Sequence, residues 1–447
     1  MNSIDRGSGD PVVVIGGGFS GLSAALELAK SGIPVTVLEA DSTPAGLAGT
    51  FDVNGQRVEK FYHHWFTNDA HIIDLVNELG VTDQVIHRPT RTGLYFANTT
   101  FRLSRPLDVL KFKPLAMIDR IRLGLLVLKA RKVKDWRQLE GVTAAEWLIQ
   151  LAGPKVYEVV WEPLLKGKFG SVADEISAVW FWNKLKLRGG SRGKGGGEVL
   201  AYYRGGFAAL ADRMAERIIQ LGGHVECNAR VTGITSAGGA VTGVVAGDRV
   251  FPARAVIATP ALPIIADLLK GHVAEAFSAS LGKIRYLANI CLVLGLDRSL
   301  SDTYWLNVND PQFPYVGVIE HTNFEPAASY GGRHIVYLSK YLPEDAELYR
   351  MRDADVLAFS LPHLKRMFPK FDKSWVKEHH VWRARYAQPI VERHYGAMIP
   401  PAGTPLSGFH IATMAQVYPE DRGTNYAVRE GRAIGRDVAR SLGESPR

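Results

Sequence analysis

The sequence predicts an α/β fold in which a split domain with a parallel sheet is joined to a mixed α+β domain. The chain has 447 residues, which is too long for one ordinary domain. Its first forty residues alternate strand, glycine-rich turn, helix and strand, and similar α/β patterns return near 205–260 and 408–440. We therefore expect the split domain to comprise 1–60, 201–275 and 401–447, and the second domain 61–200 and 276–400.

The composition is typical of a globular protein, with 46% hydrophobic and 22% charged residues. The two cysteines, Cys227 and Cys291, form no CxxC pair, so a disulfide framework, a dithiol centre and a zinc site are disfavoured. No metal site is expected. Residues 1–10 lack the apolar core of a secretory signal, and no apolar run is long enough to span a membrane. These features favour a cytoplasmic protein.

The positive charge is concentrated in one segment. The whole chain carries 53 Lys or Arg against 45 Asp or Glu, and residues 102–134 contain ten of the former and two of the latter. The rest of the chain is therefore balanced. Without a nucleic-acid motif, this pattern argues against a nucleic-acid partner.

The N-terminal segment has the residues of a dinucleotide site. A β-branched run leads into Gly16, and the spacing G-x-G-x-x-G, with Phe19 and Ser20 between Gly18 and Gly21, precedes a helix predicted over Leu22–Lys30. The first glycine allows a tight turn, the second lets backbone approach a pyrophosphate, and the third lets helix and strand pack closely. The helix N-terminus offers free N–H groups to phosphates.

The second strand of this unit ends at an acidic residue. Glu39 lies 18 residues after Gly21 and is followed by Ala40. A carboxylate at this place accepts hydrogen bonds from ribose hydroxyls and repels a 2′-phosphate, so NADP is disfavoured here. A glycine-rich turn without a ligand is the alternative.

The segment that follows resembles a family of flavoproteins. The glycine motif, Glu39 and the stretch Gly46-Leu47-Ala48 together resemble the amine oxidase, protoporphyrinogen oxidase and phytoene desaturase superfamily, with some likeness to UDP-galactopyranose mutases. The resemblance implies FAD, with Gly46–Ala48 running past its pyrophosphate and flavin. Family members often carry an Arg in this stretch, and this chain has Leu47 and Ala48 instead.

Two later segments extend the resemblance. Residues 204–260 resemble the family's middle FAD segment, which implies that Val231 meets the adenine and that Thr259 lies at the site. Residues 408–440 resemble its last motif, in which a helix starting near Asn425 turns backbone N–H groups toward the flavin. The residues implied there are Gly423, Thr424, Asn425 and Ala427. No Cys lies in 408–440, so the FAD is expected to be noncovalent.

The resemblance implies an FAD-dependent oxidoreductase that passes a hydride from an organic substrate to flavin N5. No second GxGxxG opens another strand–helix unit, which favours an oxidase, dehydrogenase or desaturase over a pyridine-nucleotide reductase. Two alternatives remain open: a non-redox, flavin-dependent sugar-nucleotide mutase, and a non-catalytic FAD-stabilised protein that binds a membrane or a partner.

Two polar clusters are candidate catalytic groups. His63 and His64 follow the FAD segment, and a histidine near neutral pH can move a proton. Glu320, His321 and Asn323 follow an apolar strand, where polar groups often face a pocket. An aromatic core turn and a plain loop are the respective alternatives.

The substrate is expected to be a small molecule, lipophilic or anionic. An apolar stripe at Leu115, Ile118, Ile121, Leu125 and Leu128 lies among basic residues of the segment 102–134. Such a helix can lie on an anionic membrane, which would make the protein membrane-associated. The alternative interpretation is a stripe packed into the core beneath a solvated basic face.

Overall fold

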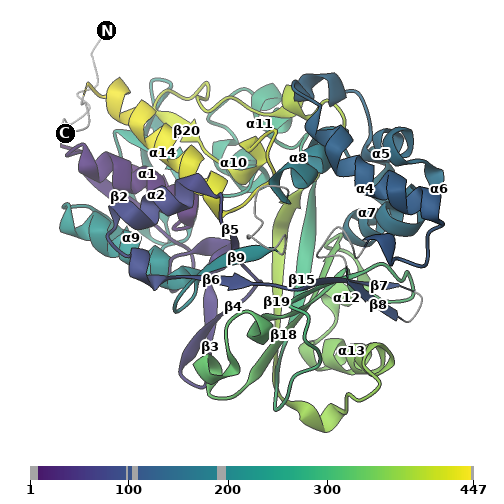
Figure 1. Ribbon diagram of the computed structural model, residues 1–447. Helices are drawn as coiled ribbons and strands as arrows, with labels where there is room; N and C mark the ends of the chain where they lie inside the picture. Colours follow the sequence, from purple (N-terminus) through teal and green to yellow (C-terminus); the bar gives the residue numbers. More distant parts are fainter. Residues whose placement is uncertain (1–8, 97–98, 103–108, 189–197, 444–447) are drawn as a thin grey trace.

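The computed structural model describes residues 9–96, 99–102, 109–188 and 198–443. Figure 1 shows its main parts: an α/β layer that carries α1, α9 and α14, a long antiparallel sheet, and a group of helices α4–α8 to one side. The predicted α/β fold with a parallel sheet is confirmed. The exact division into two domains stays a prediction.

A five-stranded parallel sheet is the centre of the α/β layer. Its three inner strands are apolar and almost entirely buried, as expected for a parallel sheet between helices. The helices of this layer are α1 (Phe19–Lys30), α9 (Phe207–Gln220) and α14 (Thr424–Ser441). The strand order is β10 (His224–Glu226), β2 (Val35–Leu38), β1 (Val12–Ile15), β14 (Ala255–Ala258) and β20 (Phe409–Ile411).

Residues 224–234, which the sequence pattern alone would make one strand, form two strands in different sheets. The chain leaves the parallel sheet after β10, and Asn228 adopts a positive φ of 57° that a strand does not allow. Its backbone N–H donates to the Asp41 carbonyl, and the chain then enters a separate antiparallel sheet. That sheet contains β11 (Val231–Ala237), β12 (Ala240–Ala246) and β13 (Arg249–Pro252).

A seven-stranded sheet forms most of the second region. Strand β15 (Tyr286–Leu296) is nearly all buried and pairs antiparallel with β18 (His334–Leu342) and β19 (Val376–Pro389). The sequence gives little sign of β19, because its buried positions alternate with charged and histidine side chains. The sheet continues through β17 (Gly317–Glu320), β16 (Trp305–Val308), β7 (Thr92–Phe96) and β8 (Thr99–Arg102), and α13 (Asp353–Met367) follows β18 in the chain.

Small elements connect the parallel sheet with the seven-stranded sheet. The hairpin β3 (Thr50–Val53) and β4 (Gln56–Glu59) follows the first βαβ unit. A three-stranded sheet pairs β9 (Val199–Tyr203) with β5 (Trp65–Phe66) and β6 (Val85–Pro89), which brings the His63–His64 segment beside α9. The remaining helices here are α2 (Ala70–Glu78), α10 (Leu262–Leu269), α11 (Glu275–Leu281) and α12 (Glu347–Arg350).

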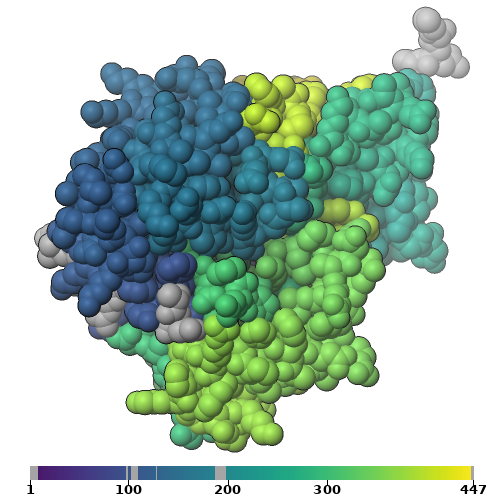
Figure 2. All heavy atoms as spheres, turned by 90° about the vertical axis from the view of Figure 1, so that its right-hand side faces the viewer, coloured from purple at the N-terminus to yellow at the C-terminus, as the bar shows by residue number. Residues whose placement is uncertain are grey.

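The helical group turns an apolar surface to solvent. Figure 2 shows this group, drawn in blue, as a large part of one face of the molecule. In α4 (Met117–Arg131), the buried side chains are Leu123, Leu126 and Ala130, on the face opposite the predicted stripe. The core interpretation of that stripe is wrong beyond Leu115: Ile118, Ile121, Leu125 and Leu128 are 43–56% exposed. The other helices are α5 (Ala144–Ala152), α6 (Pro154–Val156), α7 (Glu162–Phe169) and α8 (Ala178–Arg188).

Helices α1 and α14 touch through their backbones. A Cβ added to Gly431 would lie 2.2 Å from the Ser20 carbonyl oxygen, and one added to Gly435 would lie 2.6 Å from that of Ala24. Only glycine permits this approach. The contact aligns the first helix of the chain with the last one.

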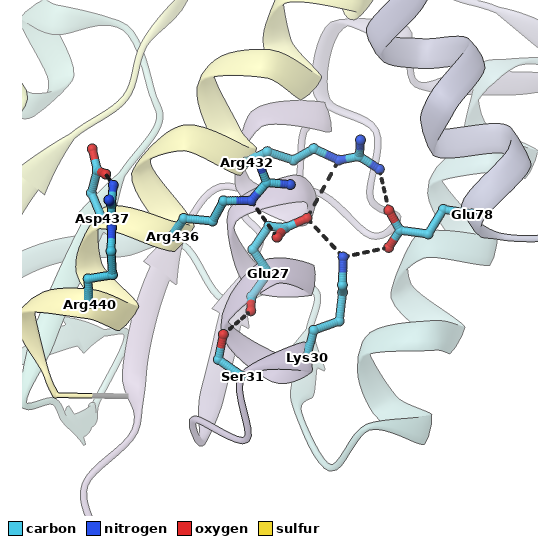
Figure 3. A network of polar contacts seen from close by, with 8 residues as sticks. All are labelled: Glu27, Lys30, Ser31, Glu78, Arg432, Arg436, Asp437 and Arg440. Carbon is cyan, nitrogen blue, oxygen red and sulfur yellow. Dashed lines mark hydrogen bonds and ion pairs between the residues drawn. The ribbon is translucent and has the colours of Figure 1, made fainter. Parts of the chain in front are cut away.

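An ion network closes the edge of the same contact. Figure 3 shows Glu27 of α1 between Lys30 and two arginines of α14, with Nε of Arg436 2.8 Å from a carboxylate oxygen. Glu78 of α2 binds Lys30 at 2.9 Å and Arg432 at 2.6 Å. Burial raises the pKa of Glu27, but the hydrogen bond from Arg436 and the charge of Lys30 outweigh it and lower the pKa overall.

Candidate functional site

The glycine turn after β1 has no room for side chains. Gly16 adopts a φ of 103°, and a Cβ there would lie 2.5 Å from Oγ1 of Thr259. A Cβ on Gly21 would lie 1.9 Å from the Gly16 carbonyl oxygen. Thr259 follows β14 and donates its hydroxyl to the Ile15 carbonyl at 2.8 Å. These contacts fix the conformation of the turn, and its glycines place no side chains over the backbone.

The start of α1 is available to a ligand. Gly18 is the N-cap, and no side chain caps this helix end, so the N–H groups of its first turn, at Phe19 and Ser20, lack a capping partner. A Cβ on Gly46 would lie only 3.4 Å from the Cα of Gly18. Backbone without side chains from two segments thus meets at one place. Such bare backbone lets a pyrophosphate approach the free N–H groups of a helix N-terminus.

The segment after β2 is bonded to the same turn. The Ala45 N–H donates to the Gly17 carbonyl at 2.9 Å, and a short 3₁₀ helix then runs over Gly46–Ala48. Ala48 is buried, whereas Leu47 is 41% exposed. The predicted stretch 46–48 therefore lies beside the glycine turn.

Glu39 is fixed at the end of β2. Its carboxylate accepts hydrogen bonds from the Gly17 N–H at 2.6 Å and the Asp41 N–H at 2.8 Å, across the half-buried Ala40. Each oxygen keeps a lone pair that can accept a ribose hydroxyl. The Glu39 carbonyl accepts from the Ala229 N–H at 2.8 Å, and this bond brings Val231, the first residue of β11, close to the same acid.

The start of α14 is the second available helix end. Gly423 is its N-cap, and again no side chain caps it, so the N–H groups at Thr424 and Asn425 can serve a ligand. The Asn425 side chain instead accepts from the Ile72 N–H of α2 at 3.1 Å, and Ala427 is buried. Because α14 packs along α1, two uncapped helix N-termini belong to one rigid pair.

His63 lies against the first residue of α9, which in turn contacts the first residue of α1. Phe207, which begins α9, has its ring 5.2 Å from that of His63 and 6.4 Å from that of Phe19. His63 Nδ1 lies 2.6 Å from the Phe61 carbonyl, so Nδ1 carries the proton and Nε2 is the basic nitrogen. Burial lowers the pKa of His63 to about 4, although the bond to Phe61 opposes it. The imidazole is neutral at neutral pH.

His64 points to a different partner. Its Nδ1 lies 3.1 Å from the Tyr304 hydroxyl, and its ring packs edge-on against Trp305 and Phe66. The two adjacent histidines therefore face different surroundings. Tyr304 also packs against Phe324, which brings the 320–324 segment to the same aromatic cluster.

Glu320 and Asn323 hold a loop. The Glu320 carboxylate accepts from Ser299 and Ser301 hydroxyls and from two backbone N–H groups of 300–301, at 2.6–3.1 Å. The Asn323 side chain donates to the carbonyls of Ser301 and Thr303 at 2.9 and 3.0 Å. Burial raises the pKa of Glu320, and these hydrogen bonds oppose it. A catalytic role for this pair stays a prediction without support from their contacts.

His321 belongs to a buried chain of polar groups that the sequence did not reveal. Its Nε2 lies 2.7 Å from the Tyr330 hydroxyl, which is within reach of Tyr202. Tyr202 donates to the fully buried carboxylate of Glu59 at 2.7 Å, and Phe207 donates to it through its N–H at 3.0 Å. Burial raises the pKa of Glu59 to about 7 and lowers that of His321 to about 4.

A group of cations lies beside α14. Arg422 directly precedes Gly423 and donates from Nη2 to the Tyr341 hydroxyl at 2.9 Å. Lys184 of α8 pairs with the buried Asp421. Lys168 of α7 lies over the Tyr341 ring, 5.2 Å from its centre. The sequence holds two signals of this group: Arg422 is next to the predicted Gly423–Asn425 segment, and Lys184 opens a stretch rich in cations.

The described part of the chain lacks two kinds of feature, a group of metal-ligating side chains and a membrane-spanning helix. Among these residues, no three His, Cys, Asp or Glu side chains are grouped so that they could hold a metal ion. Within the same ranges, no helix combines the length and the apolar character needed to cross a membrane.

The sequence matches a known family over most of its length. The family described as flavin containing amine oxidoreductase matches residues 19–436. A phytoene dehydrogenase of Streptomyces griseus is 25% identical over 312 residues, which cover 59% of this chain and 57% of that protein. Across the first curated relatives, the matched part spans 33% to 57% of their length.

Solved structures show the same fold. A cyclohexylamine oxidase from Brevibacterium oxydans superposes with a TM-score of 0.71 at 16% identity, covering 97% of this chain and 99% of that one. A reduced UDP-galactopyranose mutase superposes with a TM-score of 0.73 at 14% identity, covering 97% and 96%. At these identities the likeness establishes the fold alone.

The residues of this chain fit the cofactor of the family. FAD needs bare backbone for its pyrophosphate and an acid for its ribose, and Gly18, Gly46 and Glu39 offer these together. FAD is the cofactor, and noncovalent binding is typical of the family. The predicted resemblance is confirmed: this chain belongs to the flavin containing amine oxidoreductases, a family of FAD-dependent enzymes.

Proposed function

We propose that this protein is an FAD-dependent oxidoreductase of the oxidase, dehydrogenase or desaturase type, which removes a hydride from a small organic substrate. The flavin, when bound, supplies the hydride acceptor at N5. The single observation that carries the proposal is the close α1–α14 contact, in which no side chain caps either helix and Gly46 approaches the start of α1. The protein positions the cofactor and excludes competing reactions.

In this proposal His63 moves the proton that accompanies hydride loss. It is neutral at pH 7, its Nδ1–H is held by the Phe61 carbonyl, and its basic Nε2 can accept a proton from the substrate. His64 is the second candidate. Glu320, His321 and Asn323 are not assigned to the reaction, because the first and last support a loop and His321 belongs to a buried network.

The test begins with the visible spectrum of the purified protein. We expect two flavin bands, anaerobic bleaching by dithionite, and recovery of colour with oxygen, a quinone or NADP⁺. The fastest of these acceptors identifies the enzyme type. Acid precipitation should leave the pellet colourless if FAD is noncovalent. A protein that gains no flavin on soaking with FAD would refute the proposal.

A His63→Gln variant tests the proton step. We expect it to bind FAD normally but to lose about 10²–10⁴-fold in the rate of flavin reduction by any active substrate, the usual contribution of a general base. His272→Gln is a matched control, because His272 contacts Ser236 on an exposed surface. Equal rates in the two variants would exclude His63 from the reaction.

A sugar-nucleotide mutase is the second candidate function. The fold of a reduced UDP-galactopyranose mutase and the cations Lys168, Lys184 and Arg422 favour it. A mutase turns over without consuming an acceptor. Incubating the reduced protein with a nucleoside diphosphate sugar under anaerobic conditions distinguishes the two: isomerisation without net flavin oxidation supports the mutase.

We propose further that α4 holds the protein on an anionic lipid surface from the cytoplasmic side. Met117, Ile118, Ile121, Leu125 and Leu128 expose apolar side chains on one helix. The segment around it carries the excess positive charge of the chain. An apolar face with basic flanks matches the interior and the headgroups of such a surface.

Sedimentation with vesicles tests the membrane proposal. We expect binding to vesicles with about 30% phosphatidylserine, weak binding to pure phosphatidylcholine, and loss of binding in the Ile121→Ser, Leu125→Ser double variant. Ile219→Ser is the control, because Ile219 is 54% exposed on α9. Undiminished binding of the double variant would exclude α4 as the contact.

A further inference from the structure

Three cations from separate parts of the chain surround one carboxylate. Lys168 lies on α7, Lys184 on α8, and Arg422 directly before α14. Burial raises the pKa of Asp421, but the charges of Lys184, Lys168 and Arg422 outweigh it and hold the pKa well below its ordinary value. The three cations are therefore close enough to act on the same group.

Aromatic rings fix the position of the two ammonium groups. Lys168 Nζ lies 4.6 Å from the centre of the Trp180 ring and 5.2 Å from those of Phe169 and Tyr341. Lys184 Nζ lies 5.5 Å from the Trp180 ring. Ring faces attract an ammonium without using its N–H donors. An ammonium carries three N–H donors, so the pairing of Lys184 with Asp421 does not use them all.

Two side chains orient Arg422 by accepting hydrogen bonds from it. Its Nε donates to the Gln388 side chain at 3.2 Å and its Nη2 to the Tyr341 hydroxyl at 2.9 Å. These two bonds orient the planar guanidinium and leave Nη1 for a ligand. A guanidinium fixed in this way binds carboxylate or phosphate with a defined geometry.

The group keeps a surplus of positive charge. Asp421 pairs with Lys184, and Asp69 is the other carboxylate within electrostatic reach of that lysine. Burial raises the pKa of Asp69 to about 6, and its Oδ2 already accepts from the Phe66 N–H at 2.9 Å. Even with both carboxylates ionised, three positive charges face two negative ones.

The cation group also lies within electrostatic reach of His63. The charge of Arg422 acts on His63, adding to the burial that lowers its pKa, and also on Tyr62. Arg422 is bonded in the chain to Gly423, the N-cap of α14. A ligand held by Arg422 would therefore lie within electrostatic reach of the histidine that we propose moves the proton.

We propose that Lys168, Lys184 and Arg422 form a subsite for an acidic group of the substrate, a carboxylate or a phosphate. The inference rests on the proposed oxidoreductase function and narrows its substrate to an organic acid or phosphate. An alkylammonium group carries a positive charge at neutral pH, and these cations repel it. The family name suggests an amine, and the charges of this chain select against one.

Four ligands that share a phenyl ring test the subsite: benzoate, phenyl phosphate, benzylamine and benzyl alcohol. Each is titrated into the FAD-loaded protein, and binding is measured by calorimetry and by the shift of the flavin absorption bands. We expect benzoate or phenyl phosphate to bind at least tenfold more tightly than the amine and the alcohol. The better of the two anions distinguishes a carboxylate from a phosphate.

Variants assign the binding to these residues. Lys168→Gln and Arg422→Gln should each weaken anion binding at least tenfold, whereas Lys155→Gln, on the exposed side of α6, should not change it. If Arg422→Gln does not fold, because it also loses the contacts to Gln388 and Tyr341, the Lys168 variant decides the result. Unchanged anion binding in Lys168→Gln, or tighter binding of benzylamine than of benzoate, overturns the inference.

The outcome for the oxidoreductase function is read separately. A protein that takes up no flavin, or whose reduced flavin passes no electrons to any acceptor, refutes the proposed function. A protein that is reduced and reoxidised normally but ignores both anions overturns the subsite alone.

Discussion

Glu27 and Glu59 are both buried carboxylates near the start of the chain, yet their surroundings shift their pKa values in opposite directions. Glu27 lies among Lys30, Arg432 and Arg436 at the α1–α14 contact, and its pKa is lowered overall. Glu59 lies among tyrosines and a backbone N–H, and burial raises its pKa to about 7. Burial disfavours charge at both sites, and the partners decide the outcome.

The two sites also differ in how they respond to pH. The lowered pKa of Glu27 stabilises the fold above the ordinary value of 4.5, and this contribution is lost as the pH falls through the lowered pKa. The raised pKa of Glu59 stabilises the fold below 4.5, and this contribution is lost as the pH rises through about 7. The ionised Glu27 thus stabilises the α1–α14 contact at neutral pH, whereas the tyrosines around Glu59 favour its protonated form.

The largest effect is expected from breaking the α1–α14 contact itself. Gly431→Val should abolish the folded, FAD-loaded protein, because a Cβ there lies 2.2 Å from the Ser20 carbonyl oxygen. The measurement is the ratio of flavin to protein absorbance after purification. Gly124→Val is the control, since a side chain at Gly124 meets open space on α4, and it should keep the wild-type ratio. A yellow, stable Gly431→Val protein would show that the helices can separate without loss.

The next effect comes from the charges at that contact. Glu27→Ala removes the carboxylate from three cations and should lower the free energy of unfolding by about 2–3 kcal/mol, with some screening because Arg436 is half exposed. Asp437→Ala breaks an exposed pair with Arg440 and should cost below about 0.5 kcal/mol. Chemical denaturation at pH 7 measures both values. Similar costs would mean that the buried network adds little.

A pH series separates Glu59 from Glu27. In Glu59→Gln the group can no longer ionise, so the loss of stability between pH 5 and pH 8, at most about 3 kcal/mol, should shrink. Urea midpoints at the two pH values give the difference for wild type and variant. If the variant keeps the wild-type slope, Glu59 is ionised at both pH values and the tyrosine region does not hold a neutral carboxyl.

The smallest effect distinguishes two tyrosines around Glu59. Tyr337 donates to the Glu59 backbone carbonyl at 2.9 Å, whereas Tyr202 donates to its carboxylate. Tyr337→Phe should cost about 1 kcal/mol and leave the pH slope of stability unchanged. Tyr202→Phe should alter the slope. The same urea series measures both, and equal slopes in the two variants would contradict this assignment.

Local sequence patterns allowed the first βαβ unit and its glycine turn to be predicted. The strand β1, the glycine turn and Glu39 are contiguous, and each has one dominant physical reason for its residue type. The break between β10 and β11 depends on a single Asn228 with positive φ, which a β-branched flank conceals. The stripe on α4 was visible, but its period does not reveal which face packs.

The polar groups near His63 could not be predicted in the same way. Glu59 and Tyr202 are 143 residues apart, and Lys184 and Asp421 are even farther apart in the sequence. No spacing rule connects such pairs, because the tertiary fold alone brings them together. The interpretation of Glu320 and Asn323 as pocket residues stays a prediction, and the hydrogen bonds of both side chains to a neighbouring loop agree with the loop alternative.

The glycine contact between α1 and α14 also has a consequence for synthesis. The first helix leaves the ribosome roughly 400 residues before its partner, and until residues 424–441 follow, Ser20 and Ala24 face no helix. In the proposed FAD site, one of the two helix ends is then missing. Tight retention of FAD is therefore a late event, and a chain interrupted before α14 is distinguished from the finished protein by its failure to keep the flavin.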